Sequence, residues 1–455
     1  MALSAGTAIL SRMIARRTLP FLLAPFLARA QATVPPIILV HGNGDHAALW
    51  LTTLWRFAVN GHGQVRAISL PDPLARADDA TPQPHRSSST EQTERLAAEV
   101  ARLRAETGAA RIALVGSSRG GYPIRDFVLH QGGAAQVSHA ITCGTPNRGV
   151  YDWPFSPGAE FNGRGPFLRR LNGGETDVVE GTAFLTLRSD GNDLFAQPDG
   201  RFVGRPGVAT GITADGPARR GATNLVLPGL DHREVAFHPR AFAEIFRFIV
   251  GREPIRLDIP AEPRPILNGQ VTGSEPGVPG TAPAWQPTNR PVAGVQVAVW
   301  RLNADGSRAA RLHEVMTDAG GVWGPVPVQP DWHLEWEVAF PGRPILHLFA
   351  GPFPRGTDVF HIRPPVPLTT AEQGGAAAVR LARPRGYLGA PRDLVLVDGQ
   401  RPAIPDGVPS IGATSLNLPA GRLGQGITGV FNTETLVGRA VPTAENRVAV
   451  LEMLH

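Results

Sequence analysis

Apolar runs alternate with helical patterns between Pro35 and about Gly251. Runs of three to five mostly apolar residues are typical of strands that are covered on both faces. The predicted strands are Ile37–Val40, Arg66–Leu70, Ile112–Val115, Ala140–Cys143, Ala183–Leu187 and Leu225–Leu227. Strands that alternate with helices predict an α/β fold with a mostly parallel sheet and helices on both faces.

The helices between these strands have recognisable ends and faces. Ser88 and Glu91 form a capping box at the start of one helix, and Gly108 ends it. Two later helices are predicted from apolar residues three and four positions apart. Their apolar residues are Ile124, Phe127 and Val128 in one helix, and Phe242, Ile245, Phe246 and Ile249 in the other.

The pattern changes after Gly251. Residues 252–264 are rich in proline and are typical of a linker. Residues 265–363 then show a period of two, as in Val295, Val297 and Val299, which predicts antiparallel strands. Residues 364–455 contain further strand candidates, and the pattern does not distinguish a second module from the completion of one barrel. The predicted layout is thus an α/β domain over 33–251 followed by an all-β region.

Composition and charge narrow the class of protein. Apolar residues make up 42% of the 455 residues and charged residues 18%, which is typical of a globular chain. The formal net charge is +5, but residues 1–32 hold four arginines and no acid, so the rest of the chain carries only +1. We therefore expect no nucleic-acid partner. The single cysteine, Cys143, excludes an internal disulfide and a cysteine-based zinc site.

The first 32 residues have the pattern of an export signal. A basic stretch precedes the apolar run Leu19–Leu27, and Ala30–Ala32 supplies the small residues of a cleavage site. The run is too short to span a bilayer, so we expect no transmembrane segment. Arg16 and Arg17 resemble a twin-arginine signal, with an ordinary secretion signal as the alternative. Either signal predicts a periplasmic or extracellular protein whose mature chain begins near Thr33.

A candidate nucleophile follows the third predicted strand. Gly116, Ser118 and Gly120 form a Gly-x-Ser-x-Gly motif between that strand and a helix. In this context the serine lies on a sharp turn, where only glycines leave room for the strained backbone. The turn presents the Ser118 hydroxyl above the sheet, with the positive end of the helix behind it.

A serine hydroxyl needs a base, and the base needs a carboxylate to orient it. His232 follows the last predicted strand and precedes the last helix, which suits the base. The loop after the strand that ends at Leu187 offers two acids, Asp190 and Asp193. We favour Asp193, because the apolar pair after it can pack beneath the loop, and we expect Asp190 to cap the turn.

A tetrahedral intermediate also needs backbone N–H donors. One expected donor is Arg119, the residue after the nucleophile, and the other is Asn43 in the glycine-rich turn 41–44 after the first strand. A phosphate-binding loop is excluded for this turn, because no following lysine and no Gly-x-Gly-x-x-Gly run is present. No spacing of His, Asp and Glu makes a convincing metal site, and we expect no cofactor.

Together these motifs resemble the α/β-hydrolase superfamily, and within it the secreted lipases and esterases. The resemblance covers roughly residues 37–250 and rests on segments 41–44, 116–121, 143–149 and 231–232. It implies a catalytic triad of Ser118, Asp193 and His232 and an oxyanion hole of Asn43 and Arg119. Ser117 stands where family members often carry histidine.

The β region carries a looser resemblance of its own. Residues 265–363 are similar to transthyretin-like or carboxypeptidase-regulatory-like modules, through segments 292–297 and 317–323. The whole layout resembles archaeal and bacterial lipases with a C-terminal β-barrel.

The segment between Arg148 and Asp177 holds apolar residues among glycines and prolines. It suits an acyl-chain site or a small lid, with a packed hydrophobic cluster as the equal alternative. The candidate substrate contacts are Trp153, Phe155, Phe161 and Phe167.

The expected function is hydrolysis of medium- to long-chain acyl esters, with a lipid or ester substrate that can lie at an interface. Two alternatives stay open. One is an extracellular depolymerase of polyesters such as polyhydroxyalkanoates, with the β region binding the polymer surface. The other is a non-catalytic surface or binding protein built on a hydrolase fold.

Overall fold

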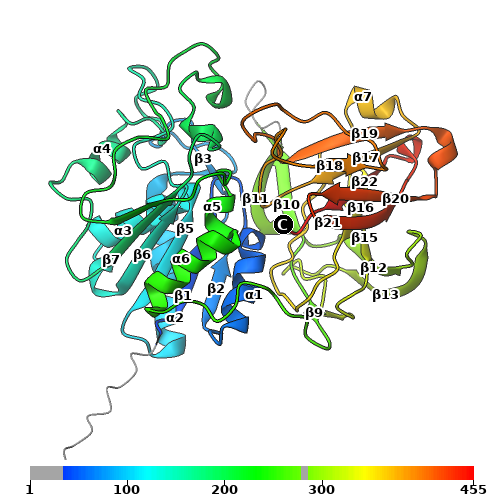
Figure 1. Cartoon of the computed structure of the whole chain (residues 1–455), viewed down its shortest axis with the longest axis horizontal. Coiled ribbons are helices and arrows are strands. Elements are labelled where there is room, and N and C mark those ends of the chain that lie inside the picture. The colour runs from blue at the N-terminus through cyan, green and yellow to red at the C-terminus, as the bar shows by residue number, and fades with distance from the viewer. Residues whose placement is uncertain (1–33, 278–284) are drawn as a thin grey trace, which may run out of the picture. The chain divides into compact units, whose positions relative to one another are not determined.

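The computed structural model describes residues 34–277 and 285–455, and the predicted export signal lies outside the described residues. The α/β part carries eight strands and six helices among these residues (Figure 1). Its strands are β1 (Ile37–Val40), β2 (Val65–Ile68), β3 (Leu74–Ala75), β4 (Arg86–Ser87), β5 (Ile112–Ser117), β6 (Val137–Cys143), β7 (Ala183–Arg188) and β8 (Thr223–Val226). Its helices are α1 (Leu51–Val59), α2 (Ser89–Thr107), α3 (Gly121–His130), α4 (Pro166–Asn172), α5 (Glu234–Phe237) and α6 (Pro239–Val250).

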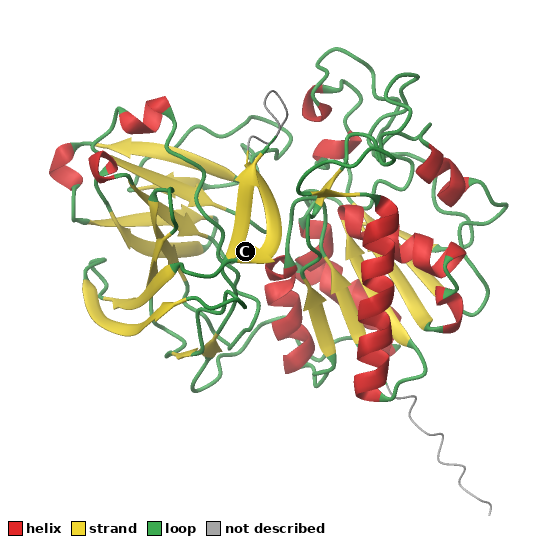
Figure 2. Ribbon diagram, turned by 180° about the vertical axis from the view of Figure 1, so that it is seen from behind, coloured by secondary structure: helices red, strands yellow, loops and turns green. Residues whose placement is uncertain are grey.

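Six strands form one parallel sheet in the order β2-β1-β5-β6-β7-β8. Side chains of β1 alternate between its faces: Ile37 and Leu39 pack with α1 and α6, whereas Ile38 and Val40 pack with α2 and α3. Figure 2 shows helices on both sides of these strands. The predicted α/β fold is confirmed, and the apolar runs are continuous because both faces of each strand are buried.

Helix α2 begins and ends at the predicted residues. The Ser88 hydroxyl accepts a hydrogen bond from the backbone N–H of Glu91 (3.2 Å), and the Glu91 carboxylate accepts one from the backbone N–H of Ser88 (2.8 Å). Gly108 ends the helix in the left-handed region, at φ +69°. These local signals suffice because capping involves only neighbours in the chain.

The C-terminal region is built of strands. They are β9 (Ile266–Leu267), β10 (Thr272–Pro276), β11 (Trp285–Pro291), β12 (Gln296–Leu302), β13 (Arg308–Met316), β14 (Val326–Pro327), β15 (Leu334–Ala339), β16 (Ile345–Ala350), β17 (Ala377–Ala382), β18 (Val395–Val397), β19 (Ala413–Leu418), β20 (Gly426–Phe431), β21 (Glu434–Arg439) and β22 (Arg447–Glu452), with one short helix, α7 (Thr370–Gln373).

One seven-stranded sheet includes strands from both stretches of the C-terminal region, residues 265–363 and residues 364–455. Its strand order is β13-β12-β15-β16-β22-β17-β19. Strand β16 of the first stretch pairs with β22 of the second. This pairing and that of β17 with β22 are parallel, whereas the other pairings of the sheet are antiparallel. The period of two therefore predicted strands correctly but not every strand direction, because each face alternates in both arrangements.

The C-terminal core also takes in residues of the α/β part. Ala47, Leu51 and Trp55 are buried in the same cluster as Trp323 and Trp336. The Trp55 indole N–H donates to the backbone carbonyl of Gly356 (2.7 Å). Helix α1 therefore contributes to both cores, with other residues facing the parallel sheet.

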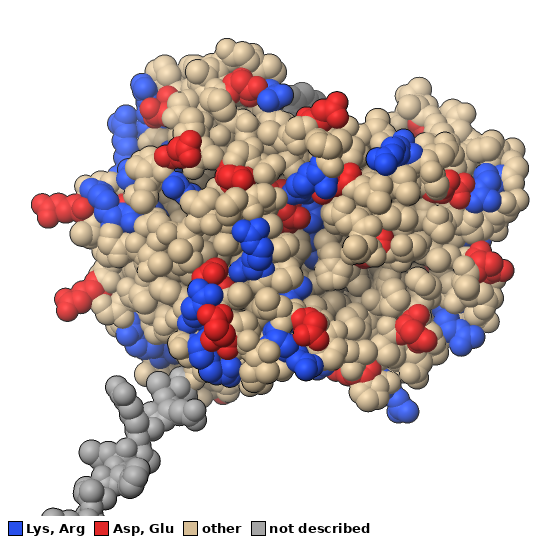
Figure 3. Space-filling view, in the orientation of Figure 1, with Lys and Arg blue, Asp and Glu red and all other residues tan. Residues whose placement is uncertain are grey.

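Charged side chains of both signs are interspersed on the face shown in Figure 3, and neither sign dominates it. Among residues 34–277 and 285–455, no helix combines the length and hydropathy needed to cross a bilayer.

Candidate active site

Ser118 lies at a strained turn between β5 and α3. Its φ is +51°, in the region that favours glycine. The flanking glycines are required by space: a Cβ on Gly116 would lie 2.6 Å from the backbone of Gly120, and one on Gly120 would lie 2.5 Å from the carbonyl oxygen of His41. The turn therefore has the geometry expected of a nucleophile elbow.

Ser118, His232 and Asp193 form a continuous hydrogen-bonded chain. The Oγ atom of Ser118 lies 2.8 Å from Nε2 of His232, and Nδ1 of His232 lies 2.9 Å from Oδ1 of Asp193. With Nδ1–H donating to the carboxylate, Nε2 is left to accept the hydroxyl proton. The structure thus brings together three residues that the sequence separates by up to 114 positions.

The loop after β7 holds Asp193 in place and gives Asp190 another task. The Asp193 carboxylate also accepts from the backbone N–H of Phe195 (2.9 Å). The ring of Phe195 packs edge-on against His232, with centroids 4.6 Å apart. Asp190 instead accepts from the backbone of Asn192 (3.0 Å) and of Gly229 (2.9 Å). The carboxylate facing the imidazole is therefore that of Asp193.

Burial differs between His232 and Ser118. His232 is only 2% exposed, and its ring is held between Asp193 and Ser118. Ser118 itself is partly exposed, so a substrate can approach its hydroxyl.

The turn after β1 passes directly beside the nucleophile. A Cβ on Gly42 would lie 3.0 Å from the Cβ of Ser118. The turn is anchored by His41, whose Nε2 accepts from the backbone N–H of Leu70 (2.9 Å). It is also anchored by Asn43, whose side-chain oxygen accepts from the backbone N–H of Ala75 (2.8 Å). Burial lowers the pKa of His41 to about 4, which keeps the ring neutral and able to accept.

The side chain of Arg119 points away from the nucleophile and is buried. Its guanidinium forms two hydrogen bonds of 2.8 Å with the carboxylate of Glu160 and donates to the backbone carbonyl of Ser87 (2.9 Å). Glu160 belongs to the predicted lid segment, so this ion pair ties that segment to the nucleophile turn. The pair could not be predicted from the sequence, because no local pattern links residues 41 positions apart.

A cavity of about 820 Å³ opens beside His232 and Asp193. Its lining mixes apolar side chains such as Leu168, Phe195 and Ile212 with polar ones. The lining also includes four arginines, which are Arg148, Arg169, Arg188 and Arg219. A cavity of this size can hold a chain of many methylene groups.

The four aromatic residues predicted to contact substrate do not line this cavity. Trp153 stacks on Phe155 with centroids 4.9 Å apart, and its indole N–H donates to the carbonyl of Ala209 (2.8 Å). Phe161 and Phe167 pack against the ring of Tyr122, at 5.9 and 5.5 Å. These four aromatic residues therefore pack against other rings of the α/β part in this structure.

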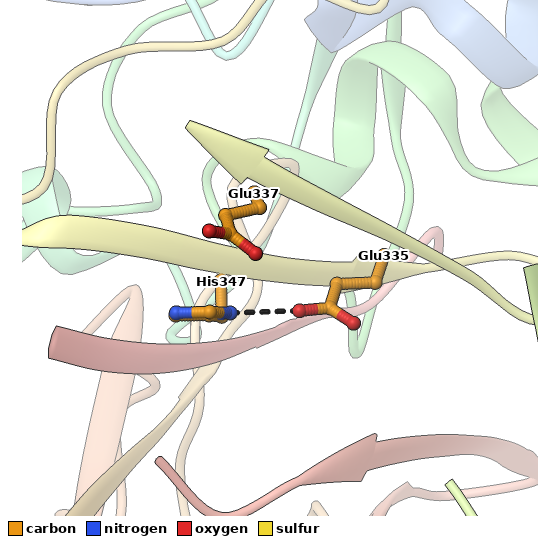
Figure 4. A group of neighbouring side chains, drawn as sticks. All are labelled: Glu335, Glu337 and His347. Carbon is orange, nitrogen blue, oxygen red and sulfur yellow. Dashed lines mark hydrogen bonds and ion pairs between the residues drawn. The ribbon is translucent and has the colours of Figure 1, made fainter. Parts of the chain in front are cut away.

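Glu335, Glu337 and His347 are a group of possible metal ligands in the described part of the chain (Figure 4). Their ligand atoms already have partners. Nδ1–H of His347 donates to Glu335 (2.7 Å), and Nε2 of His347 accepts from Arg447 (2.9 Å). Arg308 pairs with both carboxylates, and Arg439 lies 3.3 Å from Glu335. Because the guanidinium groups already supply the positive charge, the chemistry of this group favours an ion-pair network over a metal centre.

Two family models match separate parts of the chain. The model described as palmitoyl protein thioesterase matches residues 36–183, and the model described as lipase C-terminal domain matches residues 267–367. No curated protein matches the chain.

Several solved structures are similar to this chain. The mature form of the Bacillus licheniformis lipase BlEst2 is 21% identical, covering 47% of this chain and 91% of that one, with a TM-score of 0.34. Aspergillus fumigatus lipase B is 18% identical, covering 50% and 55%, with a TM-score of 0.35. Phospholipase PlaB from Legionella pneumophila is 13% identical, covering 73% and 94%, with a TM-score of 0.33.

The parallel sheet, the turn at Ser118 and the two family matches agree with one another. The first match covers the strand and turn that carry Ser118, and the second covers the strands that follow the linker. The chain therefore combines an α/β fold that is similar to palmitoyl protein thioesterases over residues 36–183 with an all-β region that is similar to lipase C-terminal domains over residues 267–367.

Proposed function

We propose that the protein is an exported serine hydrolase that cleaves medium- to long-chain acyl esters through an acyl-enzyme intermediate. The observation that carries this proposal is the hydrogen-bonded chain from Ser118 through His232 to Asp193, with distances of 2.8 and 2.9 Å. A serine, an imidazole and a carboxylate in this order form the arrangement that activates a hydroxyl for attack on an acyl carbon.

In the proposed acylation step, Oγ of Ser118 forms a bond to the ester carbonyl carbon while Nε2 of His232 takes the hydroxyl proton. The carbonyl oxygen becomes an oxyanion in a tetrahedral intermediate. When the intermediate collapses, the bond to the alcohol oxygen breaks and His232 returns the proton to that oxygen. Asp193 stabilises the imidazolium and keeps its ring in orientation.

In the proposed deacylation step, a water molecule acts as the nucleophile, as the Ser118 hydroxyl did in acylation. His232 removes a proton from the water as the water attacks the acyl carbon. When the second tetrahedral intermediate collapses, the bond between the acyl carbon and Oγ of Ser118 breaks and His232 returns the proton to Oγ. The carboxylic acid leaves and the free enzyme is restored.

The proposed oxyanion donors are the backbone N–H groups of Asn43 and Arg119. Among residues 34–277 and 285–455, the backbone–backbone hydrogen bonds outside helices and strands include none donated by Asn43. Such donors each contribute roughly 3 kcal/mol to lowering the barrier. The buried side chain of Arg119 supports the proposal, because its hydrogen bonds to Glu160 and to the carbonyl of Ser87 hold the residue in place.

The cavity beside His232 supports an acyl substrate of some length. Leu168, Phe195 and Ile212 offer apolar contacts to a chain, while the arginines of the lining offer contacts to polar atoms. The match to the palmitoyl protein thioesterase model favours acyl thioesters as a second candidate substrate, since a thioester presents the same acyl carbon to Ser118.

The test is hydrolysis of p-nitrophenyl esters from acetate to palmitate, together with palmitoyl-coenzyme A, by the wild type and by Ser118→Ala. We expect turnover that persists or rises at long acyl chains and is lost in Ser118→Ala. Turnover of any substrate that is unaffected by Ser118→Ala would refute the serine mechanism for it. Turnover of the coenzyme A thioester alone would replace the ester substrate by the thioester.

A further inference from the structure

Two buried carboxylates flank His232, and both are held by the C-terminal region. Asp231 is fully buried and immediately precedes the histidine. Its Oδ2 atom accepts from Nη1 of Arg383 (2.8 Å) and from the backbone N–H of Tyr387 (2.8 Å). These partners come from the segment after β17, more than 150 residues further along the chain.

Arg383 contacts both carboxylates at once. Its second terminal nitrogen donates to Oε1 of Glu234, and its side chain is only 3% exposed. Arg392 donates to Oε2 of Glu234 (2.8 Å) and lies 3.4 Å from Asp231. Burial raises the pKa of Asp231, but the two guanidinium groups outweigh burial, so the pKa lies below its usual value and the carboxylate is charged.

The same two carboxylates shape the turn that carries His232. Oδ1 of Asp231 accepts from the backbone N–H groups of Arg233 (2.8 Å) and Glu234 (2.9 Å). Oε2 of Glu234 accepts from the backbone N–H of Asp231 (2.7 Å). Each of the two carboxylates thus accepts hydrogen bonds both from an arginine of the C-terminal region and from the backbone next to His232. Arg383 is therefore linked to the backbone on both sides of His232 through short, charge-assisted hydrogen bonds.

The C-terminal region also contacts the turn after β1. Arg363 donates to the carbonyl of Gly44 (2.9 Å), and the side-chain amide of Asn289 donates to the carbonyl of Asp45 (2.8 Å). The Asp45 carboxylate pairs in turn with Arg233 at 2.8 Å, next to His232. The two turns that face Ser118 are therefore linked to each other and to the C-terminal region.

We propose that Arg383 is a positioning residue of the active site, which fixes the His232 turn through Asp231 and Glu234 and makes the C-terminal region a part of the catalytic apparatus. This inference rests on the proposed serine mechanism. It assigns the C-terminal region a task in the chemistry on soluble substrates, in addition to any contact with a lipid surface.

A control for this proposal exists two residues away. Arg385 is also buried, and it donates to the carbonyls of Leu454 (3.0 Å) and Met453 (2.7 Å) and to Glu452 (3.1 Å), all within the C-terminal region. Arg385→Gln therefore removes a comparable buried guanidinium without touching residues 231–234. A role of Arg383 in stability alone predicts similar behaviour of the two variants.

The experiment measures kcat and KM of the full chain for p-nitrophenyl butyrate, well below the melting temperature. For Arg383→Gln we expect kcat to fall about tenfold or more with KM within about twofold, since a misplacement near 1 Å can cost up to a hundredfold in rate. The rate at which a fluorophosphonate labels Ser118 should fall in parallel. For Arg385→Gln we expect a lower melting temperature with kcat within about twofold of the wild type.

A second substitution distinguishes a role of Arg383 in positioning His232 from a role in stability alone. In the double variant Arg383→Gln, Asp231→Asn the buried carboxylate that has lost its nearer arginine is also neutralised, so we expect the melting temperature to recover while kcat stays low. If kcat recovers with the melting temperature, or if Arg385→Gln lowers kcat as much as Arg383→Gln, the proposal is wrong. If Arg383→Gln does not fold, Arg392→Gln is measured in its place, because the Arg392 side chain is 22% exposed and its loss should destabilise the protein less. We expect a smaller fall in kcat for Arg392→Gln. An unchanged kcat would overturn the proposal.

The outcome for Ser118→Ala shows which proposal has failed. Full activity of Ser118→Ala would remove the serine mechanism itself. Loss of activity in Ser118→Ala with wild-type kcat in Arg383→Gln would remove only the positioning role.

Discussion

Gly42 and Ser118 are in contact: a Cβ placed on Gly42 would lie 3.0 Å from the Cβ of Ser118 and 3.3 Å from the carbonyl oxygen of Ser117. The chain after β1 therefore runs so close to the nucleophile turn that a side chain would require the two turns to move apart. The next residue, Asn43, is the one whose backbone N–H we propose as an oxyanion donor. This close approach makes the spacing between the two turns a sensitive feature of the site.

We expect Gly42→Ala to lower kcat for a soluble ester by about tenfold or more, because the added methyl group pushes the two turns apart by a few tenths of an ångström. The loss of stability should be small, since only one atom lies as close as 3.0 Å to the added Cβ and the next two lie at 3.3 and 3.4 Å. Gly63→Ala is the control, because no atom lies within 4 Å of its added Cβ. Equal kcat in both variants would contradict a tight spacing at Ser118.

The acid of the proposed triad can be tested with two neighbouring carboxylates. Asp193→Asn should lower kcat by roughly 10³–10⁴-fold, because the amide no longer holds the imidazole in the tautomer that accepts the serine proton. Asp190→Asn should leave kcat within about threefold and lower stability slightly, because Asp190 accepts hydrogen bonds from Ser189, Asn192 and Gly229 and none from His232. The reverse pattern in steady-state kinetics would assign the acid to Asp190.

Stability should fall in mild acid because buried histidines are neutral in the folded protein. Burial lowers the pKa of His41 and of His361 to about 4, from 6.5 for an exposed histidine. Between pH 6.5 and 4 the unfolded chain binds protons at these sites that the folded chain does not bind. Their contribution to stability is therefore complete above pH 6.5 and is lost as the pH falls toward 4, at about 1.4 kcal/mol per pH unit and group.

Urea unfolding at pH 7.5, 6.0 and 5.0 measures this loss. The variant His41→Gln lacks one of the titrating groups, so its free energy of unfolding should fall less steeply with decreasing pH than that of the wild type. Parallel curves for the two proteins would show that His41 is not the group responsible.

The group of Glu335, Glu337 and His347 should be insensitive to chelators. Burial raises the pKa of Glu335, but hydrogen bonds from Arg308 and His347 outweigh burial and hold it at about 2, so the carboxylate is charged and already paired. We expect EDTA to leave the melting temperature and kcat unchanged. Glu335→Gln should destabilise the protein by roughly 3–5 kcal/mol, because arginines are left without their buried partner. A rise in melting temperature on addition of Zn²⁺ or Ca²⁺ would instead indicate a metal site.

Export can be tested through Arg16 and Arg17. The mature protein should begin near Thr33, as read by mass spectrometry of the exported chain. Replacing both arginines by lysine should block export if the signal is of the twin-arginine type, because lysine keeps the charge but not the paired arginines. Unchanged export of the double variant would assign an ordinary secretion signal.

The sequence alone predicted the elements that local physics controls. The run Ile37–Val40 matches β1 at both ends, and the capping box of Ser88 and Glu91 begins α2 as expected. The turn at Ser118 was also recognisable, because a strand, a Gly-x-Ser-x-Gly motif and a helix are adjacent in the chain. The predicted role of Ser118 in catalysis stays a prediction, since a hydrogen bond to His232 shows proximity and not turnover.

The tertiary structure decided which distant groups meet. Asp190 and Asp193 lie three positions apart, and only the path of the loop after β7 turns Asp193 toward His232. The pairing of β16 with β22 could not be predicted either. A period of two indicates a strand but does not indicate which other strand it pairs with.

The ion pairs around the site illustrate why distant contacts could not be predicted from the sequence. Hydrophobic periodicity and capping depend on residues within a few positions of one another, so the sequence displays them directly. The contacts of Arg119 with Glu160 and of Arg383 with Asp231 join residues 41 and 152 positions apart. Such pairs form only after packing has brought the elements together and excluded water, and no local pattern records which charges will then lie side by side.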